Sequence, residues 1–333
     1  MDDFKPKKEF QSFRYSFLKV QTGTDLSHRR LPVMKAISEN PGPVLWLTAC
    51  AHGDEVGGMV VIQETFRKLR KTRLVRGSVH AFPLMNPIGF ESGTRHIPFS
   101  KEDLNRSFPG NPAGSPAERI THIISSTIRQ TEPSLVVDLH NDWIRSLPYA
   151  VLDPKVDGPW NDIYERIKDI SQKTGLPVVC EEVTGGSREW EWQRTLSGCL
   201  LTSGIPALTL ELGEAFVVNE RNVEYGVKAI FNLLDHLRMI DTGEPHFRLE
   251  IPYECQGKYL SYTHRPVVSK TGIIRFLCRP GQIVHQGQPI ARIYNAFGKL
   301  NETLRAPGRA LVLGSSDSSV AMPGVPVIAF GLL

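Results

Sequence analysis

Residues 43–55 read PVLWLTACAHGDE, an uninterrupted apolar run that ends abruptly in polar and charged residues. A run of this length and composition is typical of a strand that is buried on both faces of a sheet. The residues that follow, 57–74, place their apolar side chains at helical spacing. A buried strand that leads directly into a helix is the repeating unit of an α/β fold.

The same alternation of strands and helices continues over the first 245 residues. Further buried strands are expected at residues 78–84, 135–140 and 206–212. Helices are expected at residues 161–174 and 223–239, and another should begin at Ser115, where Ser-Pro-x-Glu forms a capping box. Residues 86–114 are rich in Gly, Pro, Asn and Ser and are expected to form a long loop. The fold class predicted is α/β, a mixed sheet flanked by helices on both faces.

The pattern changes after residue 245. From residue 250 the chain has short apolar runs broken by glycine, such as TGIIRFL and PIARIYNAFG, and no helical periodicity. Such runs are typical of a small all-β domain. The sequence therefore predicts two domains, an α/β domain over residues 1–245 and a β domain over residues 250–333.

Composition and charge exclude several classes of protein. The 333 residues carry a net charge of +4, too small to indicate a nucleic-acid or membrane partner. No apolar run reaches the 18 residues of a membrane span, and the first ten residues lack the apolar segment of a secretory signal. The five cysteines are scattered and form no CxxC pair, as expected for a reducing compartment. We therefore expect a cytoplasmic protein with a small-molecule partner, either a monomer or a homo-oligomer.

Three of the predicted strands end in residues that can bind metal or move protons. The first is followed by His52 and Glu55, the second ends in Asp138 and His140, and the third ends in Glu211. In open α/β sheets, sites form in the crevice at the carboxyl ends of the strands. We therefore expect these side chains to meet.

Two histidines and one glutamate are an established ligand set for catalytic zinc. His52 and Glu55 lie three residues apart at a strand-to-helix turn, and His140 would complete the set from a neighbouring strand. Water would take the fourth position, where zinc lowers its pKa toward neutrality. Asp138, two residues before His140 on the same strand face, is a candidate for orienting a ligand histidine.

Hydrolysis by such a water needs a base that takes its proton and hands it to the leaving nitrogen. Glu211 ends an apolar strand, and burial there would raise its pKa. Glu214 is the alternative, but it lies further into the loop, and we expect it to form a salt bridge.

The long loop supplies groups that bind anions. Arg106 follows Asn105, and a guanidinium grips a carboxylate through two parallel hydrogen bonds. Arg95 could stabilise the oxyanion of a tetrahedral intermediate. The alternative is that these arginines pair with surface acids such as Glu102, and composition alone does not decide between the two.

Together these motifs resemble a known family. The chain has, in order, HGDE at 52–55, NP at 86–87, GTR at 93–95, DLNRSFPG at 103–110, DLH at 138–140 and ELGE at 211–214. In this it resembles the succinylglutamate desuccinylase/aspartoacylase family, relatives of zinc metallocarboxypeptidases, over about residues 40–240.

The resemblance implies roles for individual residues. It implies that His52, Glu55 and His140 bind one zinc ion and that Glu211 is the general acid/base. It further implies that Asn105 and Arg106 hold the substrate carboxylate, and that Arg95 polarises the scissile carbonyl. The last 80 residues resemble the barrel-sandwich β domain of many bacterial members. We find no lysine at a hairpin tip in a carrier-like context, so cofactor attachment there is not expected.

The sequence thus predicts a zinc-dependent amidohydrolase that cleaves an N-acyl amino acid. The alternatives are a zinc carboxypeptidase that acts on short peptides and a non-catalytic zinc protein. Neither the acyl group nor the amino acid is fixed by the motifs. A cluster of Arg188, Trp190, Trp192 and Arg194 either lines the pocket or forms a surface hairpin.

Overall fold

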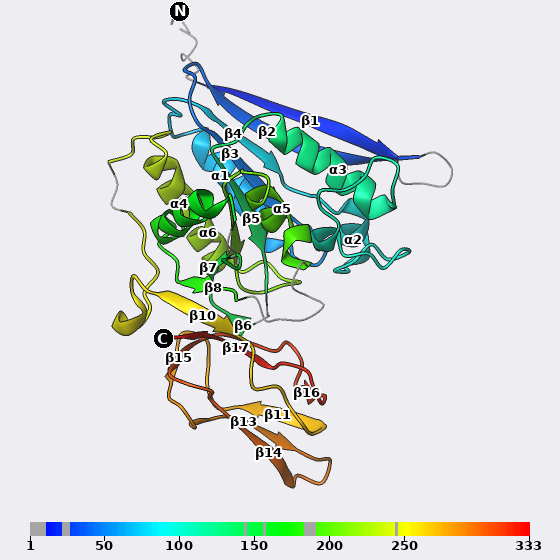
Figure 1. Ribbon diagram of the computed structural model, residues 1–333, viewed down its shortest axis with the longest axis vertical. Coiled ribbons are helices and arrows are strands. Elements are labelled where there is room, and N and C mark those ends of the chain that lie inside the picture. The colour runs from blue at the N-terminus through cyan, green and yellow to red at the C-terminus, as the bar shows by residue number, and fades with distance from the viewer. Residues whose placement is uncertain (1–10, 22–26, 143–144, 156–157, 183–190, 244–245) are drawn as a thin grey trace, which may run out of the picture.

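A large mixed sheet forms the backbone of the molecule (Figure 1). The structure is a computed structural model that describes residues 11–21, 27–142, 145–155, 158–182, 191–243 and 246–333. In sheet order the strands are β1 (Gln11–Gln21), β2 (His28–Ser38), β4 (Ser78–Phe82), β3 (Val44–Ala49), β5 (Leu135–His140), β9 (Ala207–Glu211), β7 (Tyr149–Leu152), β8 (Val178–Cys180), β10 (Tyr259–Thr263), β17 (Ile328–Leu332), β15 (Ala310–Ser315) and β12 (Ile283–Val284). The short strand β6 (Arg145–Ser146) pairs with β15.

The centre of this sheet is parallel. Strands β4, β3, β5 and β9 run in one direction, so their carboxyl ends share one edge. His140 and Glu211 are direct partners across β5 and β9 at this edge. The sequence prediction that polar strand ends meet is therefore confirmed for these two residues.

Helices cover both faces of the sheet, as the sequence predicts (Figure 1). On one face lie α1 (Gly57–Leu69), α4 (Asn161–Lys173) and α6 (Glu220–His236). On the other lie α2 (Pro87–Ser92), α3 (Pro116–Arg129) and α5 (Leu196–Leu201). Side chains along β3 alternate between these two cores, with Leu45 and Leu47 in the first and Trp46 in the second. Burial of each such side chain contributes about 1.5–3 kcal/mol to folding.

The predicted start of α3 is confirmed in detail. Ser115 Oγ accepts a hydrogen bond from the Glu118 amide at 3.3 Å, and Glu118 Oε2 accepts one from the Ser115 amide at 3.0 Å. This reciprocal pair is a capping box. In contrast, the segment 86–114 is not one long loop, since it contains α2, capped by Asn86, and the 3-10 turn η1 (Leu104–Arg106).

The sequence pattern predicted no element at residues 11–38, where the structure has the β1–β2 hairpin. Each strand has eleven residues, and β2 joins the hairpin to β4. Exposed and buried positions are mixed along β1, which lies at the sheet edge, so no continuous apolar run marks it.

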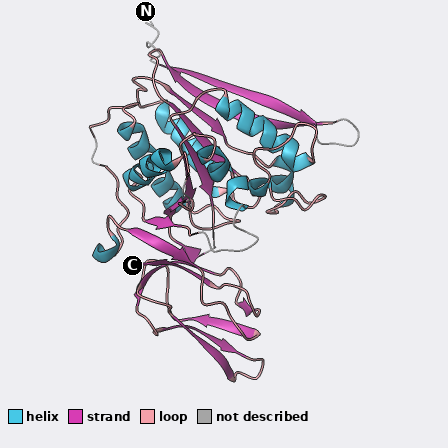
Figure 2. Ribbon diagram, viewed as in Figure 1, coloured by secondary structure: helices cyan, strands magenta, loops and turns pink. Residues whose placement is uncertain are grey.

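The described residues from 259 onward form strands β10 to β17, which confirms the predicted all-β character of this part (Figure 2). A second sheet holds β14 (Leu300–Arg305), β13 (Pro289–Tyr294), β11 (Gly272–Phe276) and β16 (Val320–Ala321). Strand β10 pairs in parallel with β8, with Leu260 opposite Val179, so the large sheet runs on into the C-terminal strands. The domain boundaries at 1–245 and 250–333 stay a prediction.

The expectation that no cofactor is attached to the C-terminal strands stays a prediction. The turn between β13 and β14 contains a lysine, Lys299, close to Phe297, whose exposed fraction is 96%.

Among the described residues, no helix has the length and apolar character needed to cross a membrane.

Candidate active site

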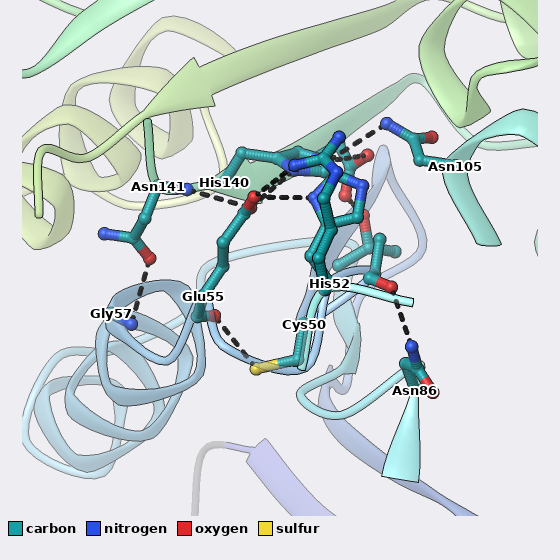
Figure 3. A network of polar contacts seen from close by, with 12 residues as sticks. Cys50, His52, Glu55, Gly57, Asn86, Asn105, His140 and Asn141 are labelled. Carbon is teal, nitrogen blue, oxygen red and sulfur yellow. Dashed lines mark hydrogen bonds and ion pairs between the residues drawn. The ribbon is translucent and has the colours of Figure 1, made fainter. Parts of the chain in front are cut away.

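Two histidines and a glutamate converge at the carboxyl edge of the parallel strands (Figure 3). His52 and Glu55 lie in the turn between β3 and α1, and His140 ends β5. The carboxylate of Glu55 lies between the two imidazoles, with Oε1 at 2.6 Å from His52 Nδ1 and Oε2 at 2.8 Å from His140 Nδ1. All three residues are buried.

The surroundings of this cluster suit a metal ion. One ligand atom from each of the three residues lies within 4.8 Å of the others. The second ring nitrogen of each histidine contacts another carboxylate: His52 Nε2 lies 3.1 Å from Asp103, and His140 Nε2 lies 2.9 Å from Asp138. Carboxylates behind the ligand histidines are a regular feature of zinc sites, because they fix the tautomer and the ring orientation. Nδ1 of each ring is then the nitrogen available to a metal ion.

The Asp138 contact matches the orienting role considered from the sequence, whereas Asp103 was not singled out for it. Asp138 is fixed in turn by Thr48, whose hydroxyl donates to Oδ1 at 2.6 Å. Asp103 contacts His52 and also accepts from Arg95 at 3.3 Å. The feature of the sequence that could have identified Asp103 is its position as the first residue of the DLNR motif.

Glu55 is held in its ionised form. Burial opposes ionisation, but the adjacent His52 and His140 outweigh it and hold the pKa of Glu55 well below its usual range. The Asn141 amide donates to Oε2 at 3.1 Å, and Arg95 donates to Oε1 at 3.2 Å. A carboxylate with these donors is well placed as a negatively charged ligand.

The turn that carries His52 depends on glycine at position 53. A Cβ atom there would lie 2.0 Å from the carbonyl carbon of Gly89 and 2.2 Å from the Phe90 amide nitrogen. Both obstacles are backbone atoms, so neither can rotate away. The close approach lets Gly53 donate its amide to the Thr94 carbonyl at 3.1 Å, which ties this turn to the loop that carries Arg95.

We expect Gly53→Ala to lower the free energy of unfolding by about 2–4 kcal/mol, because the new methyl group forces the two backbone segments apart. Denaturant unfolding measures this loss. Gly308→Ala is the matched control, since its Cβ would meet only Leu332 at 3.5 Å, an ordinary contact. Equal stability of the two variants would show that the backbone around position 53 accommodates the methyl group without loss of stability.

Glu211 lies next to this cluster. Its Oε2 atom is shielded from solvent and has no hydrogen-bond partner among the described residues. Burial raises the pKa of Glu211 well above its usual range, and the charges of Asp142 and Glu55 add to this, against the opposing effect of His140. A carboxyl group with a raised pKa suits both acceptance and return of a proton.

Glu214 turns away from the cluster. Its Oε1 accepts a hydrogen bond from Asn219 at 3.0 Å and its Oε2 accepts one from Asn222 at 2.5 Å, both at the start of α6. The expected salt bridge of Glu214 is not found among the described residues, where its partners are neutral amides that hold the helix start.

A cavity of about 320 Å³ opens onto the cluster. Its floor is one face of the sheet, where Tyr149 pairs with Glu211 and Val151 pairs with Thr209 across β7 and β9. Tyr262 of β10 also lines it, so a C-terminal strand contributes to the wall.

The three residues of the DLNR and GTR motifs that were singled out all line this cavity. Arg95 contacts Glu55 and Asp103, as described above. Asn105 accepts the Leu196 amide at 2.8 Å through Oδ1, and its Nδ2 lies 3.4 Å from His140 Nε2. Arg106 donates to the Asn105 carbonyl at 2.8 Å. Among the described residues, the ion pairs of Arg95 are with Glu55 and Asp103 and not with Glu102, whose Oε2 is buried and unpaired.

The cavity has further acidic residues that the sequence prediction missed: Asp142, Asp153 and Glu181. Asp153 and Glu181 lie just beyond β7 and β8, so the same reasoning from strand ends would have found them had those strands been identified, whereas Asp142 lies two residues beyond β5, a strand that was predicted. Of the expected Arg/Trp cluster, Arg188 and Trp190 lie outside the described residues. Trp192 is buried against Tyr164 and Leu201, and it does not line the cavity.

Comparison with known proteins agrees with this geometry. Residues 41–237 match the succinylglutamate desuccinylase/aspartoacylase catalytic domain. The chain is 26% identical over 298 residues to an N-alpha-acetyl-L-2,4-diaminobutyric acid deacetylase from Halomonas elongata, which covers 86% of this chain and 81% of that protein.

Solved structures share the fold. A succinylglutamate desuccinylase from Silicibacter sp. superimposes with a TM-score of 0.78 at 19% identity, covering 99% of this chain and 97% of that one. The product-bound ectoine utilization protein EutE (DoeB) from Ruegeria pomeroyi gives 0.77 at 22% identity, covering 98% and 100%. A metallo-carboxypeptidase from Burkholderia cenocepacia gives 0.53 at 15% identity over 67% of this chain and 65% of that one. The catalytic-domain match spans more than half of the sequence, and the chain belongs to the succinylglutamate desuccinylase/aspartoacylase family.

Proposed function

We propose that this protein is a zinc-dependent deacylase that hydrolyses the amide bond of an N-acyl amino acid. The observation that carries the proposal is the buried His52–Glu55–His140 cluster beside Glu211, whose unpaired carboxylate oxygen borders the same cavity. Family membership and the likeness to a protein named as a deacetylase support it.

In this proposal His52, Glu55 and His140 hold one zinc ion. Zinc, when bound, supplies a Lewis acid and lowers the pKa of water. Glu211 accepts a proton from the attacking water on its carboxylate and then donates it to the leaving amide nitrogen. Because the pKa of Glu211 is raised, its carboxylate is a stronger base than an ordinary one, and acceptance of the proton from water is less costly.

Arg106 and Asn105 bind the substrate carboxylate in this proposal, since both line the cavity and a guanidinium offers two parallel donors. Arg95 also lines the cavity and is assigned to the scissile carbonyl, where a cation stabilises the developing oxyanion. The scattered cysteines, all free, support placement in the reducing cytoplasm.

We expect Arg106→Lys to lower kcat/KM by roughly ten- to a hundredfold, since lysine keeps the charge but loses the bidentate geometry. Steady-state kinetics on the best N-acyl amino acid measure the change. Arg29→Lys is the matched control, because Arg29 pairs with Glu91 on the exposed surface. Wild-type constants for Arg106→Lys would assign the anchoring of the carboxylate to another residue.

A zinc carboxypeptidase acting on short peptides is the second candidate, favoured by the fold shared with the metallo-carboxypeptidase. A screen that sets N-acyl amino acids beside dipeptides separates the two functions. Faster cleavage of dipeptides would replace the deacylase proposal, and no turnover of either class by zinc-loaded protein would support a non-catalytic zinc protein.

A further inference from the structure

A second hydrogen bond lies behind the carboxylate that contacts His140. Asp138 Oδ2 lies 2.9 Å from His140 Nε2, and the other oxygen, Oδ1, accepts a hydrogen bond from the hydroxyl of Thr48 at 2.6 Å. Thr48 is a residue of β3, whereas Asp138 and His140 are residues of β5. The three side chains therefore form a chain of contacts that ends at a proposed metal ligand.

The pairing of β3 with β5 places these side chains next to one another. Thr48 and Asp138 are direct partners in this parallel ladder, so their side chains lie on the same face of the sheet. Asp138 and His140 are two residues apart on one strand and share that face. Both strands have a neighbour on each side in the large sheet. The distance between Thr48 and Asp138 is therefore fixed by the backbone of the sheet and not by a loop.

These contacts are shielded from water. Thr48, Asp138 and His140 are all buried, and the exposed fraction of Thr48 is 0%. A buried carboxylate that loses a hydrogen-bond donor cannot replace it with bulk water, so it either stays unsatisfied or turns toward another donor. A turn of Asp138 would move Oδ2 away from His140 Nε2. The orientation of the His140 ring therefore depends on the hydroxyl of Thr48.

The other histidine of the cluster is held in a different way. His52 Nε2 lies 3.1 Å from Asp103, which precedes η1 in a loop and pairs with Arg95 at 3.3 Å. The exposed fraction of the Arg95 side chain is 41%, so water reaches this side of the cluster. Water can replace a lost donor there, whereas the contacts behind His140 are closed to it. Loss of a single hydroxyl should therefore have its full effect on the His140 side.

We propose that Thr48 is a positioning residue for metal binding: its hydroxyl fixes Asp138, Asp138 orients His140, and the zinc affinity of the site depends on this order. The inference rests on the metal site of the proposed function and adds to it a residue that does not touch the ion. Thr48 lies within the apolar run of β3, outside the HGDE and DLH motifs. A purely structural role, in which Thr48 only fills space in the sheet, predicts instead that valine serves equally well.

The test uses substitutions in the full chain that separate the hydroxyl from the shape of the side chain. Thr48→Val removes the hydroxyl and nearly keeps the shape, whereas Thr48→Ser keeps the hydroxyl and removes a methyl group. Thr48→Ala is a second variant without the hydroxyl, for the case that valine does not fold. Thr65→Val is the matched control, because Thr65 is also fully buried and its hydroxyl has no hydrogen-bond partner among the described residues. Denaturant unfolding of each metal-free protein checks the fold.

Zinc affinity is measured on the metal-free proteins by competition with a chelator and needs no substrate. We expect Thr48→Val to raise the Kd for zinc by about tenfold to a hundredfold, the range typical of losing a group that orients a metal ligand. Thr48→Ser and Thr65→Val should stay within about threefold of wild type. The visible spectrum of the cobalt-loaded proteins, which reports ligand geometry, should change in Thr48→Val and stay as in wild type in the other two.

A double-mutant cycle tests whether Thr48 acts through Asp138. Asp138→Ala removes the carboxylate that joins Thr48 to His140. In that background, Thr48→Val should change the Kd for zinc by no more than about threefold, because the contact through which the hydroxyl acts is already lost. An undiminished effect of Thr48→Val in the Asp138→Ala background would contradict the chain of contacts.

Other outcomes would overturn the positioning role directly. These are an unchanged zinc affinity in Thr48→Val, a loss in Thr48→Ser as large as that in Thr48→Val, or an equal loss in Thr65→Val. Hydrolysis of N-acyl amino acids by the zinc-loaded wild type is assayed separately. If none is hydrolysed, the deacylase function fails, while the order of the zinc affinities still decides the role of Thr48. A wild type that binds no zinc would overturn both.

Discussion

Glu211→Gln is expected to lower kcat by roughly a hundredfold or more, with zinc content and substrate binding little changed. Glutamine has nearly the same shape as glutamate and keeps a hydrogen-bonding group, but it cannot accept a proton from water. Glu211 lies beside the candidate metal cluster on β9, as the partner of His140, and its Oε2 has no hydrogen-bond partner in the part of the chain that the structure describes. Steady-state kinetics with metal analysis of the same samples measure both parts of this expectation.

Glu214→Gln is the control for that experiment. Glu214 is only three residues away, but its carboxylate accepts hydrogen bonds from Asn219 and Asn222 at the start of α6. Its substitution should therefore cost some stability and far less activity. The ranking of the two variants decides the assignment: if Glu214→Gln is the inactive one and Glu211→Gln turns over normally, the proton is moved elsewhere.

His140→Ala is expected to reduce zinc from about one ion per chain to nearly none and to abolish hydrolysis with it. The substitution removes one of three ligands, and the remaining pair, His52 and Glu55, is short of the set that catalytic zinc sites use. It also leaves Asp138 buried without the imidazole that it contacts at 2.9 Å, so some loss of stability accompanies the loss of metal. Metal analysis and thermal unfolding are the measurements.

His80→Ala separates loss of zinc from loss of stability. His80 is also a buried histidine, and its ring lies 5.0 Å from that of Trp46, but it is not part of the metal cluster. The variant should lose stability and retain zinc. Full zinc occupancy in His140→Ala would refute the proposed ligand set.

The parts of the fold that the sequence predicted are those whose local pattern is strong. Strands β3, β5 and β9 are buried on both faces, so each appears as an unbroken apolar run that ends in polar residues. The proposed metal ligands and Glu211 could be predicted because they lie at or just after the ends of those runs. The start of α3 could be predicted because its capping box is a motif of only four residues, Ser115 to Glu118.

The missed features depend on contacts between distant residues. Strands β7 and β8 have four and three residues, too few for a periodic pattern, and so Asp153 and Glu181 had no visible strand ends to follow. The Asn partners of Glu214 lie in the next helix. The pairing of β10 with β8 joins residues about eighty positions apart, and nothing in either segment alone indicates its partner.

That last pairing has a consequence for how the protein is made. On the ribosome, β8 emerges well before β10, since the chain is synthesised from its N-terminus. Until residues 259–263 are available, β8 is an open edge with unpaired backbone groups, which is a site for wrong pairing with another nascent chain. The cavity wall also lacks Tyr262 during this interval. A complete cavity wall thus requires synthesis past residue 263: a chain terminated before β10 can contain every proposed zinc ligand and still lack Tyr262.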